Sequence, residues 1–110
     1  MAYTDLVSAL KTLKIPMAEN GWTSRPQANT YGVVQKDFEA DALRGDDKKL
    51  DRSWSGSVDL FSYSKNGDGF PAEVEAVLTT CCGPCWSLNS FVWESETRLF
   101  HWEWEFEVED

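Results

Sequence analysis

Strict alternation of apolar and polar residues marks the C-terminal end of the chain. Five large apolar side chains alternate there with His101 and with glutamates; they are Phe100, Trp102, Trp104, Phe106 and Val108. A period of two residues is typical of a β-strand that buries only one face. The sequence therefore predicts a closing strand whose tryptophans face the core and whose glutamates face solvent.

The segment before this strand, residues 86–93, alternates in the same way. It predicts a second strand, joined to the first by a turn near Glu96. The apolar faces of the two strands coincide when Trp86 lies opposite Phe106. A slip of one residue would turn each apolar face toward solvent, so the register of this antiparallel hairpin is strongly specified.

The predicted register also groups large side chains on the other face of the hairpin. It places Phe91 opposite His101 and Trp93 opposite Leu99, near the turn. An exposed patch of this kind is typical of a surface that binds a partner. Either a helix of the same domain covers these four residues or they form a subunit contact, and we expect the contact. We expect the same of Trp22, whose position no core pattern explains.

Two helices are predicted by apolar residues at helical spacing. The first covers residues 3–14, with Thr4 placed as its N-cap and Ile15-Pro16 ending it. The second covers residues 70–81, with Pro71 in its first turn. Both helices present one apolar stripe, so each is expected to pack against a sheet.

Three further strands complete the predicted fold. One is short and lies between residues 17 and 30, and the others lie near residues 31–35 and 54–63. The prediction is a single α+β domain over residues 1–110, in the order α-β-β-β-α-β-β. Its antiparallel sheet of four to five strands packs with the two helices.

Charge and cysteine usage exclude several classes of protein. The 110 residues carry 10 basic and 19 acidic side chains, a net charge of −9. That balance argues against a surface that wraps DNA nonspecifically and against one that binds an anionic membrane. We also expect no specific nucleic-acid binding. No apolar run approaches the ~20 residues that a membrane span needs. A secretory leader is not visible and the three cysteines are odd in number, so a reducing cytoplasm is expected.

The three cysteines, Cys81, Cys82 and Cys85, contain the C-G-P-C motif of thioredoxins. A redox motif of this type precedes a helix, whose dipole stabilises the thiolate. Here the motif follows the predicted helix, so a small thiol redox protein is only an alternative reading. A zinc site that adds His101 is disfavoured because the hairpin register separates it from Cys85 by ~20 Å. We expect no catalytic residue, metal or cofactor.

A strongly charged segment covers residues 36–52. Its apolar anchors are Phe38 and Leu43, so it is expected to be mobile in the isolated protein. We expect it to become ordered on assembly, with Phe38 in the interface and its four basic side chains on the acidic surface of a neighbour; these are Arg44, Lys48, Lys49 and Arg52. The alternating glutamates Glu103, Glu105 and Glu107 are expected to protect an edge strand from aggregation.

Short motifs in a fixed order resemble those of one protein family. They are Leu10 to Ile15-Pro16, Tyr31-Gly32-Val33-Val34, Phe38-Glu39-Ala40-Asp41 and Glu105-Phe106-Glu107-Val108. In this order the chain resembles the small tail terminator, or tail-completion, proteins of long-tailed bacteriophages and prophages. The resemblance covers nearly the whole chain.

The resemblance implies a structural virion protein without enzymatic activity, assembled in the cytoplasm of the bacterial host. Such proteins form a ring, here expected to be a homohexamer, at the head-proximal end of the tail tube. The implied partners are the tail-tube protein and a head-completion or connector protein. An acidic cytoplasmic interaction module, such as an antitoxin or immunity protein, is a further alternative that the charge permits.

Overall fold

Residues 2–39 and 53–109 are described by the structure, a computed structural model. Its elements are α1 (Tyr3–Lys11), β1 (Met17–Glu19), β2 (Thr30–Glu39), β3 (Ser53–Ser62), the 3-10 turn η2 (Gly67–Gly69), α2 (Phe70–Cys82), β4 (Trp86–Glu94) and β5 (Leu99–Glu109). Helices and strands follow one another in the predicted order α-β-β-β-α-β-β. The α+β class is therefore confirmed.

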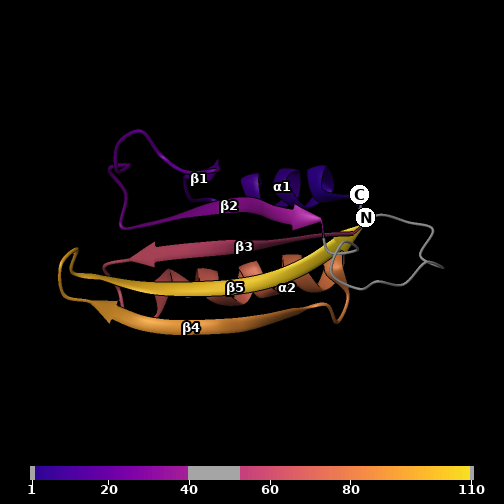
Figure 1. Ribbon diagram of the computed structural model, residues 1–110. Coiled ribbons are helices and arrows are strands. Elements are labelled where there is room, and N and C mark those ends of the chain that lie inside the picture. Colours follow the sequence, from indigo (N-terminus) through magenta and orange to yellow (C-terminus); the bar gives the residue numbers. More distant parts are fainter. Residues whose placement is uncertain (1, 40–52, 110) are drawn as a thin grey trace.

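The five strands form one sheet in the order β1-β2-β3-β5-β4 (Figure 1). Strand β5 lies between β3 and β4 and is antiparallel to both. The expectation that β5 is a protective edge strand is therefore wrong, because β4 takes the edge. The sheet is also mixed, not wholly antiparallel. Strand β1 runs parallel to β2 because the loop at 20–29 carries the chain back before β2 begins.

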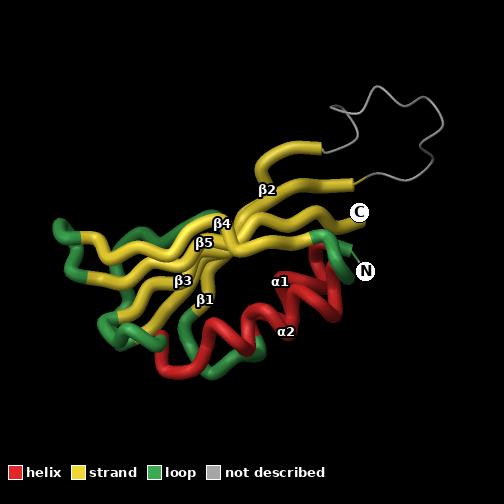
Figure 2. Tube along the Cα trace, turned by 90° about the horizontal axis from the view of Figure 1, so that it is seen from below, coloured by secondary structure: helices red, strands yellow, loops and turns green. Residues whose placement is uncertain are grey.

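Both helices lie on the same side of the sheet, which we call the helix face (Figure 2). The opposite side is the open face. The core between helices and sheet is made of apolar side chains from all of these elements, including Leu6, Leu10, Val34, Val58, Leu60, Val74, Leu78 and Trp104. Trp102 is buried with them, and Trp54 and Trp86 pack partly buried at the margin, as the alternation predicts.

The N-cap of the first helix lies two residues before the predicted one, Thr4. Ala2 is the N-cap, and its backbone N–H donates to the Asp5 carboxylate at 3.0 Å. Thr4 lies inside the first turn, so its predicted capping role is wrong. The carboxylate satisfies a backbone donor and lies at the positive end of the helix dipole. In the described ranges, no helix is long and apolar enough to cross a membrane.

The β4–β5 hairpin has the predicted register over its first half. Trp86 pairs with Phe106 and Leu88 with Trp104. A bulge at Asn89 then shifts the pairing by one residue, so that Phe91 pairs with Trp102. One extra residue in a strand moves every later side chain to the other face.

The shift corrects the predicted patch. Phe91 and Trp93 lie opposite Trp102 and Phe100 and therefore belong to the helix face. Leu99 and His101 are on the open face, where Leu99 is only 1% exposed. The four residues therefore do not form one surface.

The first four residues of the charged segment, 36–39, belong to β2. Residues 36–39 pair with β3 across a second bulge, and Phe38 lies opposite Ser55. The four basic residues expected in the interface lie outside the described residues; they are Arg44, Lys48, Lys49 and Arg52. The expected mobility of residues 40–52 concerns the same part of the chain.

Gly56 allows the sheet to hold Phe106. The two residues pair across β3 and β5, and the ring of Tyr3 stacks on Phe106 with centroids 6.3 Å apart. An ideal Cβ on Gly56 would overlap the Gln35 carbonyl oxygen and lie 2.6 Å from the Phe106 ring. The absence of a side chain at Gly56 thus leaves room for the Phe106 ring, which the Tyr3 ring of α1 contacts.

We predict that Gly56→Ala lowers the free energy of unfolding by about 1–3 kcal/mol, because the added methyl group overpacks the core. Urea denaturation followed by tryptophan fluorescence measures this change. Ser55→Ala, at the neighbouring half-buried position, is the control and should change stability by less than about 1 kcal/mol. A Gly56→Ala variant as stable as the wild type would contradict this packing.

Candidate interaction surface

Strand β4 is the exposed edge of the sheet. It has β5 on one side, and no described element lies beyond its other side (Figure 1). An edge strand presents unpaired backbone N–H and C=O groups to any strand that approaches. Natural edges are usually blunted by charges, proline or short length. The segment 86–93 is free of charged residues and proline, and Glu94 is the only charged residue in β4.

Three apolar side chains on the helix face of β4 are exposed: Leu88 at 46%, Phe91 at 42% and Trp93 at 53%. We call them the edge strip. Residues 88, 91 and 93 share this face because the bulge changes the alternation between residues 88 and 91. An apolar strip of this kind on a strand edge is typical of an interaction surface.

The edge strip is held in place by aromatic contacts beneath it. The Phe91 ring stacks on Trp102 at 4.7 Å and on Phe100 at 6.0 Å. At the other end of β4, the Trp86 indole N–H donates to the Thr79 hydroxyl of α2 at 3.1 Å. Phe91, the middle residue of the strip, is therefore preorganised, which reduces the entropy lost on binding.

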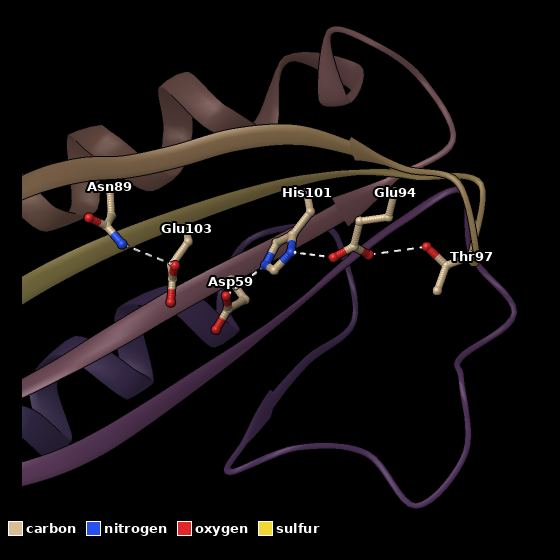
Figure 3. A network of polar contacts seen from close by, with 6 residues as sticks. All are labelled: Asp59, Asn89, Glu94, Thr97, His101 and Glu103. Atoms are coloured by element: carbon tan, nitrogen blue, oxygen red, sulfur yellow. Dashed lines mark hydrogen bonds and ion pairs between the residues drawn. The ribbon is translucent and has the colours of Figure 1, made fainter.

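On the open face, His101 lies between two carboxylates (Figure 3). Its Nε2 is 2.7 Å from Asp59 of β3 and its Nδ1 is 2.9 Å from Glu94 of β4. Glu94 also accepts a hydrogen bond from the Thr97 hydroxyl at 3.1 Å. The hydrogen bond to Asp59 raises the pKa of His101, burial opposes this and Glu94 reinforces it. The imidazole ring of His101, on β5, thus bridges β3 and β4.

This arrangement does not have the geometry of a catalytic triad. In a triad, one imidazole nitrogen faces a hydroxyl or thiol nucleophile and the other faces a carboxylate. Here both nitrogens of His101 face carboxylates, and the Thr97 hydroxyl contacts Glu94 instead of the ring. The network fits a structural role in the hairpin.

An aromatic layer covers the inner part of the open face near the turn. The Phe61 ring stacks on His101 at 4.3 Å and on Tyr31 at 5.2 Å. Trp22 meets Tyr31 edge-on, and its indole N–H donates to the Gly32 carbonyl oxygen. His101 is therefore engaged within the chain, and Trp22 is anchored by one edge while 38% of it is exposed.

The far half of the open face is acidic. A cavity of about 560 Å³ lies there, and its lining includes Asp37, Glu105, Glu107 and the hydroxyl side chains of Ser55 and Ser87. Glu103, the next open-face glutamate on β5, accepts a hydrogen bond from Asn89 of the bulge (Figure 3). The open face of this half of the sheet therefore carries the carboxylates of Asp37, Glu103, Glu105 and Glu107.

The cysteines lie where α2 ends and β4 begins. Cys81 and Cys82 are the last buried residues of the helix, and Cys85 is exposed beyond the Gly83-Pro84 turn. Burial raises the pKa of Cys81, and it raises the pKa of Cys82 to about 12. The expected position of the motif after a helix is confirmed, and the environment of Cys82 disfavours a thiolate.

We predict that the free energy of unfolding falls as the pH rises through the folded-state pKa of His101. The pKa of His101 in the folded state is raised above 6.5. Its contribution to the free energy of unfolding is therefore complete below pH 6.5 and is lost as the pH rises above the folded-state pKa. Urea denaturation between about pH 6 and pH 9 measures the slope. His101→Gln keeps a polar side chain that does not titrate and should remove this component. An identical slope in both proteins would contradict the imidazolium bridge.

We predict that a disulfide-exchange reagent labels Cys85 rapidly in the folded protein at pH 8. Cys81 and Cys82 should react only after denaturation, because both thiols are buried and resist ionisation. Absorbance of the released chromophore counts the thiols, and Cys85→Ser should abolish the fast phase. Rapid labelling of Cys82 in the folded protein would instead support the redox alternative.

Among the described residues, the edge strip and the acidic half of the open face are surfaces that could contact a partner. No protein-family model matches the sequence, and no curated protein matches it.

Proposed function

We propose that this chain is a structural virion protein, a tail terminator of a long-tailed phage or prophage. It assembles into a ring at the head-proximal end of the tail tube. Its partners are copies of itself, the tail-tube protein and a head-completion or connector protein. This role is non-enzymatic and requires no cofactor.

The order of elements supports the resemblance on which this proposal rests. Ile15-Pro16 follows α1 and leads into β1, and Glu105-Phe106-Glu107-Val108 lies near the end of the closing strand β5. The motif Phe38-Glu39-Ala40-Asp41 begins in β2 and continues beyond the described residues. The motifs thus occur with the helix and strand arrangement that the resemblance implies.

The observation that carries the proposal is the acidic half of the open face. Glu103, Glu105 and Glu107 project from β5 on this side, because their partners in β3 include Asp59 and Ser57 of the open face. Four basic residues follow β2 in the sequence, at positions 44, 48, 49 and 52. In our proposal they contact the acidic face of the neighbouring subunit.

A contact between two different surfaces is heterologous, and such contacts close into a ring when the rotation permits. The net charge of −9 also suits a ring around the path of DNA, because a negative lumen repels phosphates and lets the genome slide. Assembly through opposite charges should weaken as salt is added.

We predict that the full chain forms a ring of about six subunits at low ionic strength, as the resemblance implies. Native mass spectrometry and electron microscopy measure the mass and the shape, with the protein alone and mixed with a tail-tube protein. Glu105→Lys, at an exposed open-face position, should reduce the ring population at least tenfold.

Glu73→Lys, at an exposed position of α2 on the other side of the sheet, makes the same change of charge, from −1 to +1, and should leave the ring intact. Reversal of Lys48 and Lys49 to glutamate should restore assembly of the Glu105→Lys protein. Failure to form any ring with or without the tail-tube protein would contradict the proposal.

A further inference from the structure

We infer that β4 pairs with the β4 strand of a second copy of this chain, antiparallel, about a two-fold axis between Asn89 and Ser90. This contact uses the exposed edge of the sheet and not the acidic open face. It therefore does not depend on the proposed function, and the two can fail separately.

The bulge at Asn89 makes the two halves of β4 symmetric. Trp86 and Leu88 lie on the helix face before the bulge, and Phe91 and Trp93 lie on the same face after it. Reading outward from the bulge, the pattern of faces is therefore the same in both directions. A strand without the bulge would place residues 88 and 91 on opposite faces.

This symmetry gives a complete set of matching pairs. With the axis between residues 89 and 90, Leu88 lies opposite Phe91 of the second copy and Trp86 opposite its Trp93. Ser87 lies opposite Val92 on the open face in the same register. Every pair has both members on one face, which is the condition for cross-strand side-chain contact.

Charge also favours a second copy at this edge. Two chains that each carry a net charge of −9 repel one another, so contact is least unfavourable where carboxylates are absent. Residues 86–93 are uncharged, and Glu94 falls opposite Cys85 of the partner in this register. No carboxylate of one β4 strand therefore lies opposite a carboxylate of the other.

Pairing of two β4 strands would cover both the backbone groups and the apolar side chains that are exposed at this edge of a single chain. The outer backbone groups of β4 gain hydrogen-bond partners, and the exposed side chains of the edge strip cover one another across the axis. The result is an isologous interface, in which the same residues of both copies are used. The central pair, Leu88 with Phe91, is where truncation or charge should weaken dimerisation most.

Sedimentation equilibrium of the full chain tests the contact. At high ionic strength, where salt screens the charged contact of the proposed ring, the wild type should show a monomer–dimer equilibrium. Leu88→Lys should raise its dissociation constant at least tenfold by placing two charges beside the axis. Trp93→Ala, which truncates a side chain that is 53% exposed, should weaken the dimer without unfolding the monomer. Ser8→Lys is the matched control and should dimerise as the wild type does.

Oxidative cross-linking tests the register. In a Cys85→Ser background, Ser87→Cys with Val92→Cys should form a disulfide-linked dimer, because these positions face each other across the axis. Within one chain they are ~16 Å apart, too far for a disulfide. Ser87→Cys with Ser90→Cys is the out-of-register control and should cross-link at least tenfold less. A wild type that stays monomeric at every soluble concentration would overturn the inference, as would equal cross-linking of both pairs.

Discussion

The position of β5 between β3 and β4 is the constraint on which the rest of the structure depends. Its helix face supplies Trp102, Trp104 and Phe106 to the core, and both neighbouring strands are aligned by pairing with it. The alternate residues of the same strand supply His101 and the glutamates of the open face. One strand thus fixes the core on one side and the charge distribution on the other, while β4 is left at the edge.

Two different features stabilise the two halves of the β4–β5 hairpin: the hydrogen bonds of His101 and the bulge at Asn89. Near the turn, the imidazole of His101 joins Asp59 and Glu94, which would otherwise be two like charges on adjacent parts of the sheet. Farther along, Asn89 leaves the regular ladder as a bulge and donates to Glu103 at 3.2 Å. The bulge places Phe91 on the Trp102 ring and so creates the edge strip. Both features serve the stability of the hairpin, and the second also shapes the surface available to a partner.

Periodicity in the sequence is sufficient to predict the helices, the strands and most of the core, because burial of Trp104, Leu60 and Leu78 depends on local spacing. The pairing of Trp86 with Phe106 follows from the same logic. The bulge at Asn89 is not anticipated by strict alternation, although the spacing of three residues between Leu88 and Phe91, with Ser90 at an expected apolar position, is its signal in the sequence. It moves Phe91 and Trp93 away from Leu99 and His101. The contact between Asp59 and His101 does not follow from periodicity either. It depends on which strand lies beside β5, and alternation carries no information on strand order.

Amide hydrogen exchange of the segment 86–94 at increasing protein concentration tests most directly whether this molecule acts through its exposed edge. If β4 binds a second copy, its outward-facing amides should exchange more slowly as concentration rises, while the amides of α1 keep a constant rate. Exchange of β4 that is independent of concentration, in a sample that remains folded, would contradict the account. The edge strip would then be exposed surface with no copy of the chain upon it.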